Sequence, residues 1–311
     1  MRIIRTLDEV RAEDRGASAA MGNFDGVHRG HASVIDLARR PGAPLGVVTF
    51  EPHPRAFFAP ESPPFRLMNA ASRAHRLARI GVQTLFELPF GSALAGLEAE
   101  AFARDVLAGA LGLRHVVVGA DFKFGRKRSG DAEALERFGR TYGFDVTVAG
   151  MLASGESFIS STAIREALAE GRPDVAARML GHRHRIDGVV GHGDKRGRDL
   201  GYPTANLAID GLMLPRFGVY AVRFEVLTGP HAGVYGGAAS LGVRPTFGVN
   251  APNLETYVFD FDGDLYGAEV SVALVSFLRG EERFDDLDAL IDQMKADCDL
   301  ARERLAAVDA V

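Results

Sequence analysis

The sequence is poor in cysteine, in long apolar runs and in excess positive charge. Its 311 residues include one cysteine, Cys298, which excludes an internal disulfide and any zinc site built from several cysteines. No apolar run approaches the ~18 residues that a membrane-spanning helix requires. The formal net charge of -5 argues against general electrostatic affinity for nucleic acid or acidic membranes. The opening residues, MRIIRTLDEV, lack the apolar core and cleavage site of a signal peptide, so we expect a cytoplasmic protein.

The first half of the chain alternates short β-branched runs with amphipathic stretches. The whole chain is 47% apolar and 25% charged, which is the composition of a packed soluble protein. The strand-like runs are residues 45–50, 84–90, 115–119 and 145–150, and the helix-like stretches are 31–40, 69–80, 98–111 and 131–142. This alternation predicts a Rossmann-like α/β domain, with a parallel sheet covered on both faces. Ligands of such sheets bind beyond the carboxyl ends of the strands.

From about Arg185 the pattern changes to strand-like runs separated by glycine-rich turns. These runs are residues 185–193, 218–227, 233–242, 255–261 and 270–278. They predict an antiparallel barrel or sandwich, and residues 285–305 return to helical periodicity, which predicts a terminal helix. The length favours two domains, which we place at residues 1–181 and 182–311. The expected fold class is therefore α/β plus β.

Two histidines stand three residues apart in the glycine-rich stretch MGNFDGVHRGH, residues 21–31. Its glycines let the backbone approach a ligand closely. A helix beginning here would offer N–H groups and the positive end of its dipole to an anion, with His28 and His31 on one face of its first turn. A zinc site needs further ligands, and none accompanies the pair. Helix caps or surface residues stay open as the simple alternative to a phosphate clamp.

The stretch ISSTAIREAL, residues 159–168, follows a strand and opens a helix. Ser161 or Thr162 can cap that helix while Arg165 projects from its first turn. Hydroxyls, N–H groups and a guanidinium together suit a polyphosphate. A simple helix cap is the alternative interpretation.

Two loops of the first half carry aromatic and basic side chains. In EPHPRAFF, residues 51–58, two prolines stiffen a loop that presents His53 and aromatics to a flat ring. In DFKFG, residues 121–125, at least one phenylalanine is expected in the core. The basic run GRKRSG that follows is typical of a solvated turn.

The most informative run downstream is GHGDKRGRDLGYPTANL, residues 191–207. Its backbone N–H groups and cations suit phosphates, although the chain has neither a Walker A pattern nor protein-kinase motifs. In an extended PTAN segment, Thr204 and Asn206 point the same way. Both present oxygens that suit magnesium shared with nucleotide phosphates. A proline turn beside a polar strand edge is the alternative.

Four stretches of the first half match, in order, the FAD synthetase form of the nucleotidylyltransferase superfamily. GNFDGVHRGH resembles its H-x-G-H signature, and the later matches are TFEPHP (49–54), VVGADFKFGRKRSGD (117–131) and ISSTAIREAL (159–168). In the second half, GYPTANL resembles the G-x-P-T-A-N motif of riboflavin kinases. LGVRPTFG (241–248) before NLETYVFDFDGDLYG (253–267) resembles the loop and strand that carry their catalytic glutamate. The whole chain resembles the bacterial bifunctional riboflavin kinase/FMN adenylyltransferases.

The resemblance implies an FMN adenylyltransferase site in the first half. His28, His31 and Arg165 would be catalytic and would stabilise the phosphates of ATP during adenylate transfer. The residues implied at the ATP are Gly22, Phe24, Asp25, Gly30, Ser160, Ser161 and Thr162. The residues implied at the flavin are Pro52, His53, Asp121 and Phe124.

The resemblance implies a riboflavin kinase site in the second half, with Glu255 as catalytic base. A carboxylate can accept the proton of the ribityl hydroxyl as the γ-phosphoryl group arrives, although an exposed position of an alternating strand also explains a glutamate here. The metal ligands for Mg²⁺ would be Thr204 and Asn206. The nucleotide would contact Gly193, Lys195, Gly201 and Pro203, and the flavin would contact Arg279 and Glu281.

One departure from the family concerns the end of the last predicted barrel strand. The family often reads L-R-P-E there, whereas this chain has LRGE at residues 278–281. Gly280 lacks the fixed φ of proline, so we expect a looser loop and a changed affinity for riboflavin.

The predicted function is two-step synthesis of a flavin cofactor. The C-terminal domain would phosphorylate riboflavin with Mg-ATP to FMN, and the N-terminal domain would adenylylate FMN with a second ATP to FAD, releasing pyrophosphate. One alternative makes the C-terminal domain a flavin-binding regulatory module without kinase activity, and another gives the nucleotidylyltransferase a different substrate, such as a pantetheine or nicotinamide nucleotide. Riboflavin, FMN and ATP are the expected small-molecule partners. We expect no nucleic-acid or membrane partner, and a weak homo-oligomer stays open.

Overall fold

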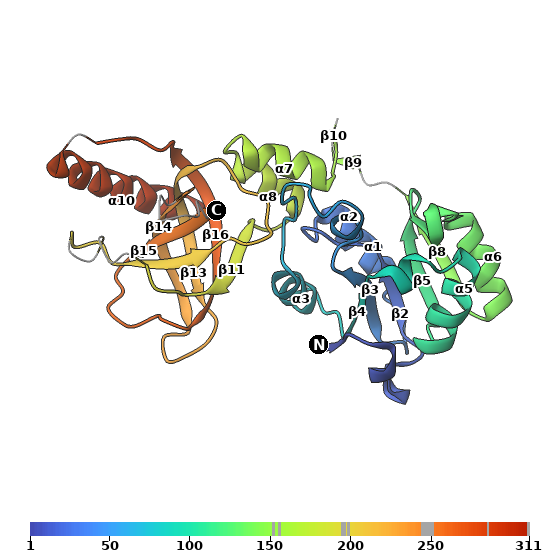
Figure 1. Cartoon of the computed structure of the whole chain (residues 1–311). Coiled ribbons are helices and arrows are strands. Elements are labelled where there is room, and N and C mark those ends of the chain that lie inside the picture. Colours follow the sequence, from blue (N-terminus) through green and yellow to red (C-terminus); the bar gives the residue numbers. More distant parts are fainter. Residues whose placement is uncertain are drawn as a thin grey trace. The chain divides into compact units, whose positions relative to one another are not determined.

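The structure is a computed structural model of the chain (Figure 1). It describes residues 1–150, 153–154, 157–193, 197, 200–243, 252–284 and 286–309. The chain divides into two compact units. Unit 1 comprises Met1–Pro63 and Arg73–Ile159, and unit 2 comprises Pro64–Ser72 and Ser160–Val311.

Unit 1 contains a six-stranded sheet in the order β1-β4-β3-β2-β5-β8. Every neighbouring pair is parallel, which confirms the predicted parallel sheet. The strands are β1 Arg2–Ile4, β2 Ser18–Met21, β3 Leu45–Glu51, β4 Thr84–Pro89, β5 His115–Gly119 and β8 Asp145–Ala149. The sequence pattern does not indicate β1, because three residues are too few to show a periodicity.

Helices flank this sheet, and short elements connect them. The helices are α1 Arg29–Leu37, α2 Pro54–Phe58, α3 Ala70–Arg79, α4 Ser92–Ala95, α5 Ala99–Ala101, the π-helix η3 Phe102–Ala110 and α6 Ala132–Tyr142. The short elements are η1 Leu7–Glu9, η2 Ala12–Asp14, β6 Lys123–Phe124, η4 Arg126–Arg128, β7 Gly130–Asp131, β9 Ala153–Ser154 and β10 Ser157–Phe158. The stretch predicted as one helix over 98–111 is thus an α-helical turn followed by a π-helix.

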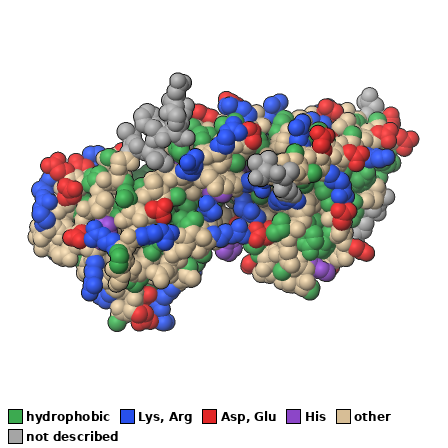
Figure 2. Space-filling view, turned by 180° about the vertical axis from the view of Figure 1, so that it is seen from behind, with side chains coloured by type: hydrophobic (Ala, Val, Ile, Leu, Met, Phe, Trp, Pro, Cys, Tyr) green, Lys and Arg blue, Asp and Glu red, His purple; other side chains and the backbone are tan. Residues whose placement is uncertain are grey.

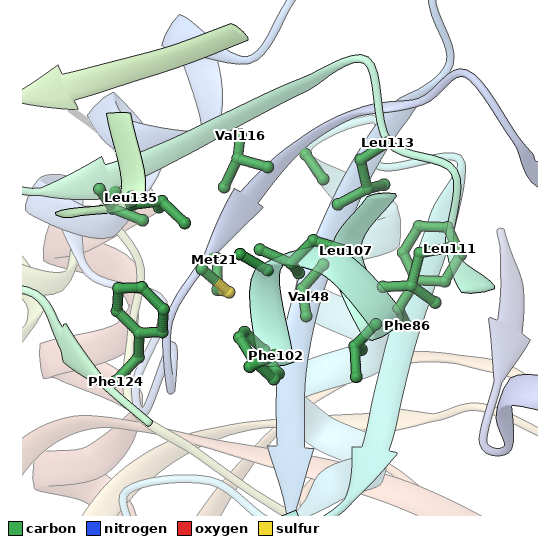
Figure 3. Close-up of a cluster of buried hydrophobic side chains, with 14 of the residues drawn as sticks. Met21, Val48, Phe86, Phe102, Leu107, Leu111, Leu113, Val116, Phe124 and Leu135 are labelled. Atoms are coloured by element: carbon green, nitrogen blue, oxygen red, sulfur yellow. The ribbon is translucent and has the colours of Figure 1, made fainter. Parts of the chain in front are cut away.

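One face of the sheet in unit 1 packs against η3 and α6. Figure 3 shows Met21 and Val48 of the sheet beside Phe102 and Leu107 of η3 and Leu135 of α6. All five belong to one buried hydrophobic cluster. Packing of this face holds the strands rigid, so the loops at their carboxyl ends project from a fixed scaffold.

Unit 2 contains a six-stranded antiparallel sheet in the order β11-β16-β13-β14-β15-β12. Its strands are β11 Arg185–Val189, β12 Thr204–Ala208, β13 Gly218–Val226, β14 Gly233–Val243, β15 Pro252–Val258 and β16 Glu269–Arg279. The two outer strands of this order are joined by a bridge in which the N–H of Gly191 donates to the carbonyl of Asn206 at 2.9 Å. The sheet is therefore a nearly closed barrel, as predicted.

Among the described residues of unit 2, the helices beside the barrel are α7 Ser161–Ala169, α8 Pro173–Leu180 and α10 Leu287–Asp309. The terminal helix α10, red in Figure 1, packs on the barrel through a cluster that joins Ala301 and Leu305 to Ala221, Ala238 and Val275. This confirms the predicted terminal helix. The helices α7 and α8 contribute to a separate cluster with Leu67 and Met213.

The charges on the surface and the polarity of the helices agree with the amino-acid composition. Figure 2 shows Lys and Arg side chains together with Asp and Glu side chains across the face on view. Within the described ranges, every helix is too short or too polar to cross a membrane.

A buried histidine joins three strands of unit 1. Nδ1 of His115 lies 2.7 Å from the hydroxyl of Ser18, and Nε2 lies 2.9 Å from that of Thr147. His115 is 1% exposed, and burial, aided by Arg40, lowers its pKa to about 4. The neutral ring is therefore the form that the fold accommodates.

Unit 1 should lose stability as the pH falls from about 6.5 toward 4. In this window the unfolded state binds a proton at His115 that the folded state excludes, so protonation favours unfolding. The contribution of His115 at pH 5 relative to pH 7 is at most about 2 kcal/mol. Urea unfolding of His115→Gln at both pH values, with hydrogen exchange of the β2 and β5 amides, should show a smaller pH difference than the unsubstituted protein. The exposed His192→Gln is the control, and an unchanged pH difference in His115→Gln would contradict the assignment.

Candidate active sites

The turn between β2 and α1 has an unusual backbone conformation. Phe24, Gly26 and Val27 have φ values of 51°, 88° and 41°. Glycine adopts such angles freely, whereas a β-branched residue there is strained. Phe24 and Val27 are each 1% exposed, so packing of their side chains holds the backbone in place. Strain of this kind concentrates at ligand-binding sites.

His28 and His31 lie together at the start of α1, as their spacing predicts. His28 is the N-cap, and its Nδ1 accepts a hydrogen bond from the N–H of His31 at 3.2 Å. An accepting Nδ1 leaves the proton of a neutral ring on Nε2, which can therefore donate to a ligand. The two rings stack with their centroids 3.6 Å apart. Gly30 leaves room for the stack, because a Cβ there would lie 3.1 Å from Cε1 of His28.

His31 is a neutral ring with an unsatisfied nitrogen. Burial, and then the neighbouring His28, lower the pKa of His31 well below its ordinary value of 6.5. Nδ1 of His31 is buried and has no hydrogen-bond partner among the described residues. A buried polar atom without a partner costs free energy that a ligand can relieve. The helix N-terminus and this ring together suit an anion.

The loop that follows β3 presents a histidine and an aromatic group. His53 is 9% exposed and caps α2, its Nδ1 accepting from the N–H of Arg55 at 3.0 Å. Phe57, Phe58 and Phe90 stack edge to face, with centroids 5.2 to 5.8 Å apart. Phe58 is 68% exposed, so a flat aromatic ligand has an apolar surface to cover here.

The other residues that the resemblance implies in unit 1 differ in their exposure to solvent. Asp25 is 4% exposed, and Asp121, just after β5, is exposed. Phe124 is 8% exposed and belongs to the core cluster, where Figure 3 shows it beside Phe102. Of the two phenylalanines in DFKFG, Phe124 is thus the core residue, and Phe122 packs against it with centroids 5.7 Å apart.

Arg73 is a residue of this region that the sequence pattern does not indicate. It is 1% exposed, and its Nη2 donates to Glu51 at 2.8 Å and to Glu87 at 2.9 Å. Its Nη1 donates to the carbonyl of Asn23 at 3.5 Å, which also accepts from the hydroxyl of Thr49 at 3.3 Å. These contacts connect the turn after β2 with the ends of β3 and β4. A lone arginine in a helix carries no signal of them, because all its partners are distant in sequence.

The serines before α7 correct one prediction. The helix begins at Ser161, and its N-cap is Ser160, whose hydroxyl accepts from the N–H of Ala163 at 3.1 Å. The cap is therefore not Ser161 or Thr162, because Ser160 is the last residue with extended backbone. Arg165 is the fifth helical residue, in the second turn rather than the first. Its Nε donates to the carbonyl of Phe65 at 2.6 Å, and it belongs to unit 2, whereas the two histidines belong to unit 1.

In unit 2, the strands β12 and β15 bring three implied kinase residues together. Asn206 pairs directly with Glu255 in the register of the two strands. The hydroxyl of Thr204 donates to Oε2 of Glu255 at 3.4 Å, and Nδ2 of Asn206 donates to the carbonyl of Thr204 at 3.0 Å. The alternate residue Leu207 lies in the barrel core, so Thr204 and Asn206 share the opposite face, as predicted.

Two pockets meet at Thr204. The first, of about 360 Å³, is lined by Glu255 and Tyr257 of β15, by Arg279 and Glu281, and by residues of α10. The second, of about 440 Å³, is lined by Pro203, Ala205 and the stretch 261–266. Thr204 lines both. A group transferred between ligands in these pockets would therefore pass beside Thr204 and Glu255.

Gly193 leaves room for the side chain of Asn206. A Cβ at Gly193 would lie 2.5 Å from Nδ2 and 2.8 Å from Oδ1 of Asn206. Pro203 lines the second pocket, and Gly201, with a φ of 83°, turns the chain just before it. Lys195, together with Arg196 and Arg198, lies outside the described residues, as does the RPTFG part of the predicted loop.

The terminal helix contributes to the first pocket, which the sequence pattern does not reveal. Leu290, Met294, Asp297 and Cys298 of α10 line it. Arg279 donates to Asp297 through Nε at 2.9 Å and through Nη2 at 2.7 Å. This two-point ion pair fixes the end of β16 against α10. Burial, and then Asp297, raise the pKa of Cys298 to about 11, so its thiol is protonated at neutral pH.

The described residues supply too few ligands to hold a metal by themselves. A bound substrate or water would have to complete the coordination. No group of three or more His, Cys, Asp or Glu side chains able to hold a metal occurs among them. The hydroxyl of Thr204 and the amide oxygen of Asn206 are hard donors of the kind that Mg²⁺ accepts. Mg²⁺ is commonly held by few protein ligands together with water and substrate phosphates. The two residues therefore fit Mg²⁺ bound with a nucleotide.

Comparisons with known proteins agree for both halves of the chain. The family model described as FAD synthetase matches residues 10–163, and the one described as riboflavin kinase matches residues 180–305. A solved structure from Streptococcus pneumoniae, described as a macrolide-efflux protein, is 32% identical, with a TM-score of 0.82 over 96% of this chain and 98% of that chain.

Two similar proteins carry both names. The bifunctional riboflavin kinase/FMN adenylyltransferase of Pseudomonas fluorescens is 41% identical over 100% of this chain and 99% of that protein. The protein of the same name from Escherichia coli K12 is 39% identical over 97% of each. The two family models also match in the order that the sequence motifs predict. The chain therefore belongs to the family of bifunctional riboflavin kinase/FMN adenylyltransferases.

Proposed function

We propose that residues 182–311 phosphorylate riboflavin to FMN and that residues 1–181 adenylylate FMN to FAD. The observation that carries the kinase assignment is the convergence of Thr204, Asn206 and Glu255 where two pockets meet. The adenylyltransferase assignment is supported by the stacked histidines at the N-terminus of α1. Riboflavin, FMN and ATP are then the small-molecule partners.

In the kinase step, riboflavin occupies the first pocket and ATP the second. The terminal ribityl oxygen attacks the γ-phosphorus, and Glu255 accepts the hydroxyl proton as the new P–O bond forms. The bond from the γ-phosphorus to the β–γ bridging oxygen breaks, and ADP leaves. Thr204 and Asn206 would hold Mg²⁺, which would supply positive charge to neutralise the phosphates. Arg279 and Glu281 border the flavin.

In the adenylyl step, a phosphate oxygen of FMN attacks the α-phosphorus of ATP, and pyrophosphate leaves. The FMN phosphate is already ionised, so no strong general base is required. Rate enhancement rests on positioning and on stabilisation of charge. His28 can donate from Nε2, and His31 offers Nδ1, which has no partner among the described residues. Phe58 offers the flavin ring an exposed aromatic surface.

The test of this proposal is to incubate the protein with riboflavin, ATP and Mg²⁺ and to separate the flavins by chromatography. FMN should form first and FAD should follow. If the protein forms FAD from added FMN but no FMN from riboflavin, the barrel is a flavin-binding module without kinase activity. FMN without FAD would remove the adenylyltransferase assignment.

Gly193→Ala should lower riboflavin phosphorylation at least about tenfold, because the added Cβ displaces the amide of Asn206 and small displacements of this kind are costly in catalysis. Adenylylation of supplied FMN should not change. Gly191→Ala is the matched control, since its Cβ would meet only the carbonyl of Asn206 at 3.9 Å. Both rates follow from one flavin separation, and equal kinase rates in the two variants would contradict the placement of Asn206.

Gly280→Pro should change the affinity for riboflavin, because proline fixes a backbone angle that glycine leaves free. Gly280 follows Arg279 at the border of the first pocket, and Nη1 of Arg279 donates to its carbonyl at 2.9 Å. Titration of riboflavin fluorescence with each protein measures the dissociation constant. An unchanged dissociation constant would show that the loop does not control flavin binding.

A further inference from the structure

Asn253 stands on β15 two residues before Glu255, so that both side chains leave the same face of the strand. It is half-buried. Its Nδ2 donates to Oδ1 of Asn206 and to Oε1 of Glu255, each at 3.3 Å. One amide group thus contacts a residue that we assign to the metal and the residue that we assign as the base.

Each carboxylate oxygen of Glu255 accepts a hydrogen bond from a neutral donor. Oε1 accepts from Asn253 and Oε2 accepts from the hydroxyl of Thr204. Two donors, one on each oxygen, restrain the plane of the carboxylate. Without Asn253, Oε1 would lose this restraint.

The contacts around Asn206 also depend on Asn253. Nδ2 of Asn206 donates to the carbonyl of Thr204 at 3.0 Å, and Oδ1 accepts from Asn253 at 3.3 Å. An amide has distinct donor and acceptor ends, so these two bonds select one of its two orientations. That orientation places the oxygen, rather than the nitrogen, on the side of Asn253 and Glu255.

We propose that Asn253 is a positioning residue for riboflavin phosphorylation, which holds the base carboxylate of Glu255 and the metal-ligating amide of Asn206 in register. The proposal rests on the roles of Glu255 and Asn206 given under the proposed function. Asn253 acts through these two groups and forms no bond to the reacting atoms. A residue that only joined two strands would affect stability but would not lower kcat while leaving KM for riboflavin unchanged.

The experiment measures kcat and KM of riboflavin phosphorylation in Asn253→Leu and Asn253→Asp. In Asn253→Leu, kcat should fall about tenfold to a hundredfold, while KM for riboflavin stays within about threefold. Asn253→Asp keeps the shape of the side chain but replaces its donor amide by a second acceptor, so kcat should fall at least as far.

Two controls make the outcome decisive. Thr256→Val changes the neighbouring residue, whose hydroxyl is buried and has no partner among the described residues, and it should leave the kinase rate unchanged. Adenylylation of FMN should persist in every variant. An unchanged kcat in either Asn253 variant, or a KM for riboflavin that rises as much as kcat falls, would overturn the proposal. Glu255→Gln is measured in parallel: if it is fully active, both the base assignment and this inference fail, whereas an inactive Glu255→Gln beside a normal Asn253→Leu removes the inference alone.

Discussion

Replacing both His28 and His31 by alanine should abolish FAD formation, by about 10³-fold or more, and should leave riboflavin phosphorylation intact. The two rings stack at the N-terminus of α1, where the helix already favours an anion. Removing donors that stabilise charge in a transition state typically costs about 10²- to 10³-fold each. The kinase residues lie in unit 2, so the same preparation should still convert riboflavin to FMN.

The single variants separate chemistry from helix capping. His28→Ala removes the cap as well as the ring, at a cost of about 1 kcal/mol in stability. His28→Asn restores a good cap without an imidazole, so it should fold like the unsubstituted protein and still fail to form FAD. His75→Ala, on an exposed histidine of α3, is the control for histidine loss in general. Full adenylylation by the double variant would overturn the assignment of this site.

Glu255→Gln should lower riboflavin phosphorylation by about 10²- to 10⁴-fold, the range expected for loss of a general base. Glutamine keeps the size of the side chain and accepts hydrogen bonds at one end, so the barrel should fold normally. It cannot take the ribityl proton. When FMN is supplied, the variant should form FAD at the normal rate, as measured by chromatographic separation of the flavins.

The matched control for this substitution is Glu269→Gln. Glu269 is an exposed glutamate at the start of β16 and lines neither of the two pockets. The Glu269→Gln variant should keep its kinase and adenylyltransferase activities unchanged. A Glu255→Gln enzyme with full kinase activity would show that another group accepts the proton, and the kinase mechanism would have to be rebuilt.

The fold was predictable where the pattern is local. Strand β5 occupies the predicted residues 115–119, because a continuous apolar run bounded by a helix end and a glycine is a local signal. The segment Pro64–Ser72 joins unit 2, and no local signal marks this. Its place depends on contacts such as the one between Leu67 and Met213, which are far apart in the sequence.

In the candidate sites too, local features were predictable from the sequence, whereas contacts between distant residues were not. Thr204 and Asn206 are predictable as neighbours because side chains of a strand alternate. The pairing of Asn206 with Glu255 depends on a strand register that spans about fifty residues of chain, which the residues alone do not specify. Arg73 and Asn253 acquire their contacts only through such distant pairings. The wall that α10 contributes to the first pocket is likewise a product of packing.

The most direct test of the account traces phosphorus from ATP into the flavins. The protein is incubated with riboflavin, Mg²⁺ and ATP labelled either at the γ- or at the α-phosphorus, and FMN and FAD are then separated and counted. The account predicts γ-label in both FMN and FAD, and α-label in FAD alone. Label from the γ-position missing from FMN, or label from the α-position missing from FAD, would contradict it.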